Sequence, residues 1–297
     1  MKAFVRATLA TFALFALVSC SPRGDFPEYP DTTSHTAHNG PWAEAIAPLE
    51  AAYDRRDDVE VNRLVAQLGA EFRDVYGEDS VPYAEITMYA ALQLYREHRD
   101  EASLPYFRDA LQHYRAALGS EHQDVAVALH TYGDALISAR GASAAAEAEP
   151  LYREAYTIRF STLGAADIQT LGVAEEVFDA MSMQVGGPND QSQADAFMAN
   201  ALDVAANSEL DMLSRLRLTE ATTYFADQLA DRREFEKATA RYLQAREQLF
   251  LLPTSTWSLA HSIYPGLIDS LTAQNRLVQA AAFEIEYLIM RATQLTQ

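Results

Sequence analysis

One pattern occurs twice between residues 103 and 181, and this repetition constrains the fold more than any other feature of the sequence. Matched positions of the two copies, such as Ala110 and Ala155, lie 45 residues apart. A fainter copy precedes them at a shift of 42, with Gly77 in the place of Gly119. A fixed period of this length, with two amphipathic helices in each unit, is typical of helical-repeat solenoids, which grow by stacking.

Apolar residues recur at a helical period from Trp42 onward, and no segment alternates apolar and polar residues as an exposed strand would. The predicted helices span residues 42–53, 59–75, 82–97, 101–117, 122–139, 144–161, 167–183, 190–206, 209–230, 233–250, 256–273 and 277–295. Ser120 and Gln123 have the spacing of a capping box. Pro265 and Gly266 predict a kink or break inside their helix. The expected fold is all-α, a right-handed α-solenoid of about 11–12 helices.

Each repeat contains a small residue, an aromatic or large residue four positions later, and an alanine three positions after that. The matches are Ser103/Phe107/Ala110, Ala148/Tyr152/Ala155, Ala238/Tyr242/Ala245, a looser Ala194/Met198/Ala201, and a weak Ala281/Ile285/Leu288. Small residues allow two helices to approach closely, and the large one fills the space between neighbouring repeats. This pattern resembles tetratricopeptide repeats (TPRs), in the longer form found in kinesin light chains. The resemblance implies stacked helix pairs and says nothing about chemistry.

The amino terminus has the layout of a secretory signal, with Lys2 and Arg6 followed by an apolar run too short to span a membrane. The run ends at Cys20, the only cysteine of the chain, in a sequence that resembles the lipobox of bacterial lipoproteins. That resemblance implies cleavage before Cys20, its lipidation (palmitate among the acyl chains), and, with Ser21 following, sorting to the outer membrane. An ordinary signal peptide with a chance cysteine is the alternative. The expected organisation is a signal peptide (1–19), a lipidated cysteine with a disordered tether (20–41), and a repeat domain (42–297).

The chain is acidic, with 42 Asp and Glu against 23 Lys and Arg. Removal of Lys2 and Arg6 with the signal peptide leaves 21 basic residues and a net charge of 21 − 42 = −21. A charge of this sign disfavours nucleic acid and anionic membrane surfaces as partners of the body. A solvated acidic surface that maintains solubility is the simplest interpretation.

The sequence has no glycine-rich phosphate loop, no His-Glu-x-x-His and no Gly-x-Ser-x-Gly. We therefore expect no catalytic residues, no cofactor and no metal site. His130 and Asp134 lie one turn apart on a predicted helix, which is the spacing of a general-base pair. A polar pair on a binding groove or an ordinary surface is the favoured interpretation of these two residues.

The resemblance to TPRs implies that the residue after the small packing residue of each first helix faces a peptide-binding groove. In this sequence those positions hold Leu92 and then four aspartates, spaced 45, 48 and 42 residues apart: Asp134, Asp179, Asp227 and Asp269. On the same faces, Glu175 falls one turn before Asp179, and Glu220 falls two turns before Asp227. The hypothesis is an acidic groove that selects a partner segment rich in Lys or Arg. The alternative is that these helices carry polar residues wherever they meet water.

These patterns favour a lipid-anchored TPR adaptor at the outer membrane, facing the periplasm, which binds another protein and performs no catalysis. The alternative is a helical-repeat envelope protein that binds or processes a small ligand, such as a glycan, in cell-wall metabolism. Convergent carboxylates with perturbed pKa values in a closed pocket would favour that alternative.

Overall fold

The computed structural model describes residues 42–184 and 188–294, so the predicted signal peptide, Cys20 and the tether lie outside the described residues. Throughout the described ranges the secondary structure is helical, with no strand. The chain divides into two compact units at the Leu151–Tyr152 bond. Within the ranges described, no helix is both long and apolar enough to cross a bilayer.

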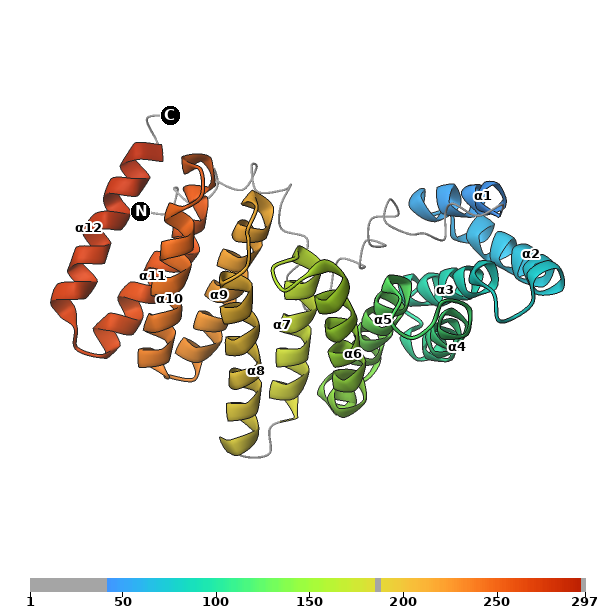
Figure 1. Ribbon diagram of the computed structural model, residues 1–297, viewed down its shortest axis with the longest axis horizontal. Helices are drawn as coiled ribbons and strands as arrows, with labels where there is room; N and C mark the ends of the chain where they lie inside the picture. Colours follow the sequence, from blue (N-terminus) through green and yellow to red (C-terminus); the bar gives the residue numbers. More distant parts are fainter. Residues whose placement is uncertain (1–41, 185–187, 295–297) are drawn as a thin grey trace, which may run out of the picture. The chain divides into compact units, whose positions relative to one another are not determined.

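The first unit is a succession of helices in which each packs on the next along the chain (Figure 1). Its helices are α1 (Ala43–Asp54), α2 (Asp58–Tyr76), α3 (Val81–Arg96), α4 (Asp100–Leu118), α5 (Gln123–Arg140), a 3-10 helix (Gly141–Ala144) and the beginning of α6 (Ala145–Leu163). An aspartate and a serine side chain cap two of them. Asp57 accepts from the Glu60 amide before α2, and Ser80 accepts from the Tyr83 amide before α3.

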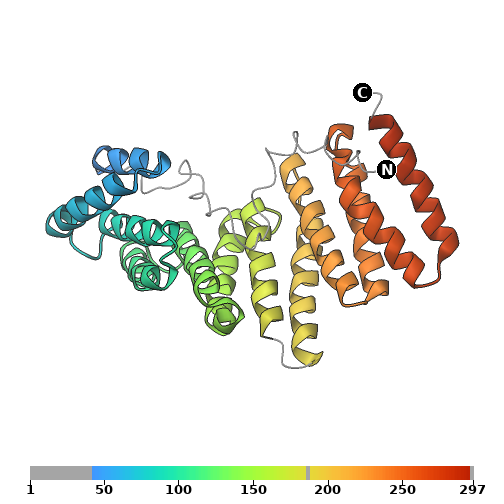
Figure 2. The ribbon, with the colours of Figure 1, turned by 180° about the vertical axis from the view of Figure 1, so that it is seen from behind.

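The second unit contains the end of α6 and six further α-helices, which stand side by side in both views (Figure 1, Figure 2). They are α7 (Ile168–Met183), α8 (Pro188–Ala206), α9 (Met212–Asp231), α10 (Phe235–Phe250), α11 (Ala260–Ala273) and α12 (Leu277–Gln294), with a 3-10 helix (Thr254–Leu259) before α11. Sequential helices pack together, and α9 also contacts both α7 and α11. The odd-numbered helices of this unit therefore form a layer of their own.

Two kinds of turn recur between the helices. One kind ends an even-numbered helix with a glycine at positive φ, a conformation that side chains disfavour. These glycines are Gly77, Gly119 and Gly164, with φ of 82°, 82° and 94°. The other kind places a non-glycine residue in the left-handed region, within the pairs α1–α2, α3–α4, α9–α10 and α11–α12. These residues are Arg56, His98, Arg233 and Asn275. His98 follows Arg56 by 42 residues, and Asn275 follows Arg233 by the same number.

The packing motif predicted from the sequence is buried at four of its five places. The residues of the motif in α4, α6, α8 and α10 are each at most 2% exposed. The match proposed for α12 is wrong, because Ala281, Ile285 and Leu288 are exposed. Ala280 and Tyr287, one residue earlier in register, face the core instead.

Two further local predictions need correction. Of the kink or break predicted at Pro265 and Gly266, the break is wrong, because α11 continues through both residues. A Cβ on Gly266 would overlap the Tyr242 ring and hydroxyl, so glycine is required there for close approach of α10 and α11. The predicted capping box at Ser120 is also wrong, because α5 begins after His122, whose Nδ1 accepts from the Asp124 amide.

We expect Ala110→Trp in α4 or Ala155→Trp in α6 to destabilise the protein, because neither alanine is accessible to solvent. Overpacking a close helix contact costs about 1–3 kcal/mol, and more where the helices cannot separate. Thermal and urea unfolding measure the effect. Ala102→Trp is the matched control, because Ala102 is exposed on the same helix as Ala110. A tryptophan at position 110 that unfolds at the wild-type midpoint would contradict the repeat register in α4.

Candidate binding face

Three of the four predicted aspartates lie on the layer of odd-numbered helices in the second unit. Asp179 is on α7, Asp227 on α9 and Asp269 on α11, and α9 contacts the other two helices. We call the set of Asp179, Asp227 and Asp269 on these three helices the acidic face. Asp179 is half-buried, whereas Asp227 and Asp269 have side chains that water can reach.

Tyrosine hydroxyls hold two of these carboxylates in place. Tyr224 on α9 donates to Asp179 Oδ1, and Tyr242 on α10 donates to Asp227 Oδ1. Burial is the first cause that raises the pKa of Tyr242, and the charges of Asp227, Asp231 and Asp269 raise this pKa further. Asp269 and Asp231 therefore share the electrostatic environment of the Tyr242 hydroxyl with Asp227.

Glu175 and Glu220 belong to a charged cluster around Arg217. Arg217 Nη2 donates to Glu175 Oε2 at 2.6 Å, and Arg217 Nη1 lies 3.9 Å from Glu220 Oε2. Glu175 and Arg217 are both buried, with 9% and 5% of their surface exposed. Glu175 thus neutralises a buried cation between α7 and α9, and it does not present an open carboxylate. Glu175 Oε1 and Arg217 Nε have no hydrogen-bond partner among the described residues.

Four carboxyls on α7 and α9 share a direction of pKa shift. Burial is the largest cause and raises the pKa of Glu175, Asp179, Glu220 and Asp227 above the ordinary values of 4.5 for Glu and 3.8 for Asp. Arg217 opposes the shift in the glutamates, and the tyrosine hydroxyls oppose it in the aspartates. The folded chain therefore binds these protons more tightly than the unfolded chain. Their contribution to the free energy of unfolding is largest in acid and falls as pH rises from these ordinary values through the raised ones.

The remaining predicted residues, His130 and Asp134, lie in the first unit on α5. His130 Nε2 is 3.8 Å from Asp134 Oδ1, and both side chains are half-buried. This distance is longer than a hydrogen bond. The pair keeps the helical spacing expected from the sequence, and a role in partner binding remains a prediction for both residues.

The sequence reasoning missed Arg217 and Tyr224, although the repeat period contained a signal for both. Arg217 follows its partner Glu175 by 42 residues, and Tyr224 follows Asp179 by 45. Residues one period apart occupy equivalent places on neighbouring helix pairs. Their side chains are therefore candidates for contact between one helix pair and the next. Opposite charges at that separation are the signal that marks the ion pair.

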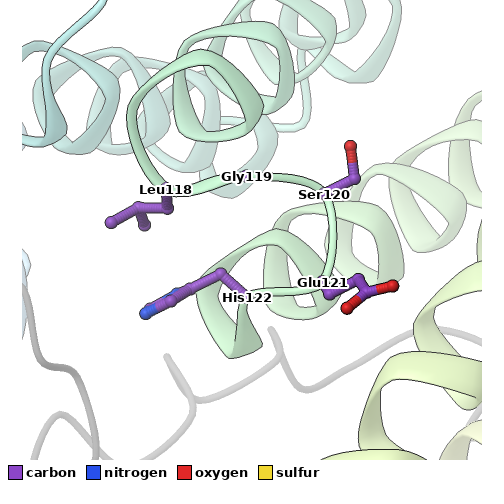
Figure 3. A pocket seen from close by; sticks show the side chains of 5 residues that line it. All are labelled: Leu118, Gly119, Ser120, Glu121 and His122. Carbon is purple, nitrogen blue, oxygen red and sulfur yellow. The ribbon is translucent and has the colours of Figure 1, made fainter.

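An open hollow of about 590 Å³ lies elsewhere, at the turn between α4 and α5. It is lined by the five consecutive residues 118–122. Figure 3 shows Leu118 and His122 extending to one side of this turn, and Ser120 and Glu121 to the other. These side chains do not converge on a common point, so the hollow lacks the geometry of a pocket in which several groups act on one ligand.

We expect Glu175→Leu or Arg217→Leu alone to lower the free energy of unfolding by about 3–5 kcal/mol, because each leaves a buried charge without its partner. The double variant should recover most of this loss, because leucines fill the site without any charge. Urea unfolding of the four proteins gives the coupling energy. Glu60→Gln is the control, because the Glu60–Arg63 pair is exposed and its loss should have little effect. Additive effects of the two substitutions would contradict a coupled pair.

Comparison with solved structures identifies the fold. The chain is similar to a crystal structure of the nearly identical TPR-like repeats of a kinesin light chain from Podosopora anserina, with a TM-score of 0.53, 16% identity, and coverage of 72% of this chain and 96% of that one. A variant form of the same protein gives a TM-score of 0.53 at 15% identity, covering 72% of this chain and 97% of that one. BtubC (BKLC) from P. vanneervenii gives a TM-score of 0.52 at 13% identity, covering 89% of this chain and 94% of that one. No protein-family model and no curated protein matches the sequence. The chain is an all-α stack of helix pairs that resembles TPR-like repeat structures.

Proposed function

We propose that this chain is a lipid-anchored adaptor which binds a basic segment of another protein across the acidic face and performs no catalysis. The observation that carries the proposal is the placement of Asp179, Asp227 and Asp269 on three consecutive odd-numbered helices, α7, α9 and α11. Repeat stacks of this kind bind extended or helical segments along a row of equivalent positions. A row of carboxylates favours Lys or Arg in the bound segment.

The raised pKa values of Asp179 and Asp227 support this choice of partner. Burial, the first cause of both shifts, disfavours the charged form in the free protein. A bound cation would stabilise the charged form of these carboxylates. The hydrogen bonds from Tyr224 and Tyr242 keep Oδ1 of Asp179 and Oδ1 of Asp227 oriented before the partner arrives. The acidic face is therefore preorganised for a cationic ligand, which lowers the cost of binding.

The spacing of the helices implies a spacing in the ligand. Axes of packed helices lie about 8–10 Å apart, and an extended chain advances about 3.3 Å per residue. Carboxylates on successive odd-numbered helices would therefore meet every third residue of an extended segment. The probe that follows is a peptide with Lys at every third position, compared with a peptide of the same composition in which the lysines are contiguous.

We expect Asp179→Asn, Asp227→Asn and Asp269→Asn together to weaken binding of the spaced peptide about tenfold or more, because three weak ion pairs are lost at once. Fluorescence anisotropy measures the affinity, and circular dichroism checks that the helices are retained. Binding by the wild type should weaken with salt, because the Debye length falls from about 8 Å at 0.15 M to about 3 Å at 1 M.

The matched control neutralises three exposed carboxylates outside the acidic face: Glu209→Gln, Glu236→Gln and Glu247→Gln. Both triple variants lose the same net charge, so a nonspecific electrostatic effect would weaken both equally, and that result would contradict the proposal. Equal affinity for the two peptides would contradict the extended geometry. Binding of a neutral glycan in place of either peptide would favour the small-ligand alternative.

The anchor and location are proposed from the sequence. The apolar run that ends at Cys20 resembles a lipoprotein signal, and Ser21 after the cysteine resembles the outer-membrane sorting pattern. Several acyl chains on one terminus give stable attachment, whereas a single chain binds membranes only marginally. The repeat domain would then face the periplasm on a tether of about twenty residues, between Cys20 and Trp42.

We expect Cys20→Ala to release the protein from the membrane fraction, because the residue that would carry the lipid is lost. Mass spectrometry of the wild-type protein should find an acylated cysteine at the mature amino terminus. Pro22→Ala is the control and should leave the protein in the membrane fraction. An unmodified Cys20, or a mature chain that begins elsewhere, would contradict the anchor.

A further inference from the structure

The last helix of the second unit, α12, carries apolar residues on two faces, only one of which is covered. Ala280 and Met290 are buried, and Phe283 and Tyr287 pack against the core of the unit. A second apolar row is open to solvent. Figures 1 and 2 show α12 at the edge of the unit, with α11 on one side and no described helix of this unit on the other. A helix that is apolar on both faces is stabilised by burial of both.

Polar contacts hold α12 firmly on its covered face. Arg246 Nη2 of α10 donates to Glu286 Oε1 at 2.6 Å, and the Tyr264 hydroxyl of α11 donates to the same oxygen at 2.5 Å. The Tyr287 ring stacks on Tyr264 with the ring centroids 5.4 Å apart. Since these contacts already fix the helix, a partner that docks on its open face does not bear the cost of ordering it.

The open row has the spacing of a coiled-coil seam. Val278, Ala281, Ile285, Leu288 and Ala292 are separated alternately by three and four residues, as at the a and d positions of a heptad. Val278 is 86% exposed, Ile285 60% and Leu288 54%. Isolated exposed apolar residues are ordinary, but a continuous seam of this kind marks a contact surface.

We propose that α12 pairs antiparallel with α12 of a second copy of this chain, forming a twofold-symmetric dimer. In the register that places Ile285 opposite Leu288 of the other copy, Leu288 meets Ile285 in return. Ala281 then meets Ala292 on either side, so large residues fill the centre and small residues allow close approach at the flanks. The seam is self-complementary, as the interface of a symmetric dimer must be.

Charge complementarity identifies the occupant as a second copy. Glu284 and Arg291 are exposed and lie seven residues apart, both at the position that precedes an a residue of the seam. In the proposed register Glu284 of each copy faces Arg291 of the other, which gives two equivalent ion pairs. A parallel arrangement would lose both ion pairs, because each g position there faces an e position of the other helix, so these residues favour the antiparallel one. A membrane surface fits less well, because Glu284 lies beside the centre of the seam and Arg291 alone supplies a cation.

The test is sedimentation velocity of the full-length chain in a mild non-ionic detergent, with wild type expected to form a dimer. Ile285→Glu should weaken the dimer at least about tenfold by placing two carboxylates at the centre of the seam. Glu284→Arg and Arg291→Glu should each weaken it about tenfold, because each converts both ion pairs into repulsions. The double variant Glu284→Arg/Arg291→Glu should restore dimerisation, because the pairs reform with opposite polarity.

Matched controls separate this pairing from other associations. Val59→Glu and Glu71→Arg make comparable changes at exposed positions of α2 and should leave the dimer intact. Circular dichroism and the melting temperature confirm that each variant is folded. A monomeric wild type, or a dimer that tolerates Ile285→Glu, overturns the proposal. Single charge changes that weaken the dimer without rescue by the double variant overturn the antiparallel register.

Discussion

Close approach between helices, at points where one side contributes a small residue, is the interaction on which the rest of the structure depends. In α10, Ala238 and Ala245 flank Tyr242, all three are buried, and the Tyr242 ring lies against Gly266 of α11. The backbone at position 266 can approach only because glycine has no Cβ. The same tyrosine places its hydroxyl on Asp227. One side chain thus joins two helices and orients a carboxylate of the acidic face.

The repeat period predicted the fold well because packing recurs with it. The predicted helices end within a few residues of the observed ones, and the motif is buried in α4, α6, α8 and α10. The packing motif was misplaced in α12, where Ala280, Ala281 and Ala282 are three small residues in succession and apolar residues line both faces. With no single small residue to fix the register, the pattern matched the exposed row instead of the buried one. The packing role of Gly266 was missed because the ring that requires a glycine there, Tyr242, lies on another helix.

The positions of the candidate residues in the fold, but not their role, could be predicted from the sequence. The period placed Asp179, Asp227 and Asp269 at equivalent positions of successive helices, and the structure puts them on α7, α9 and α11. It did not predict that Glu175, one turn away from Asp179, is buried against Arg217. Periodicity gives the direction of a side chain from its own helix, whereas burial and pairing depend on what the neighbouring helix presents. That information resides in side-chain lengths and rotamers, which a one-dimensional pattern does not contain.

Five arginines of this chain connect one helix pair with the next. Arg96 pairs with Asp58, Arg140 with Glu101, Arg217 with Glu175, Arg241 with Asp203 and Arg246 with Glu286, and each pair joins residues 38 to 42 positions apart. Exposed pairs add little stability individually, but pairs repeated at the period favour one register of stacking over its alternatives. With 23 cations against 42 acidic residues, lateral pairing of this kind leaves carboxylates in excess. Asp179, Asp227 and Asp269 are not among the carboxylates of these five pairs, and this is why we propose that they serve recognition.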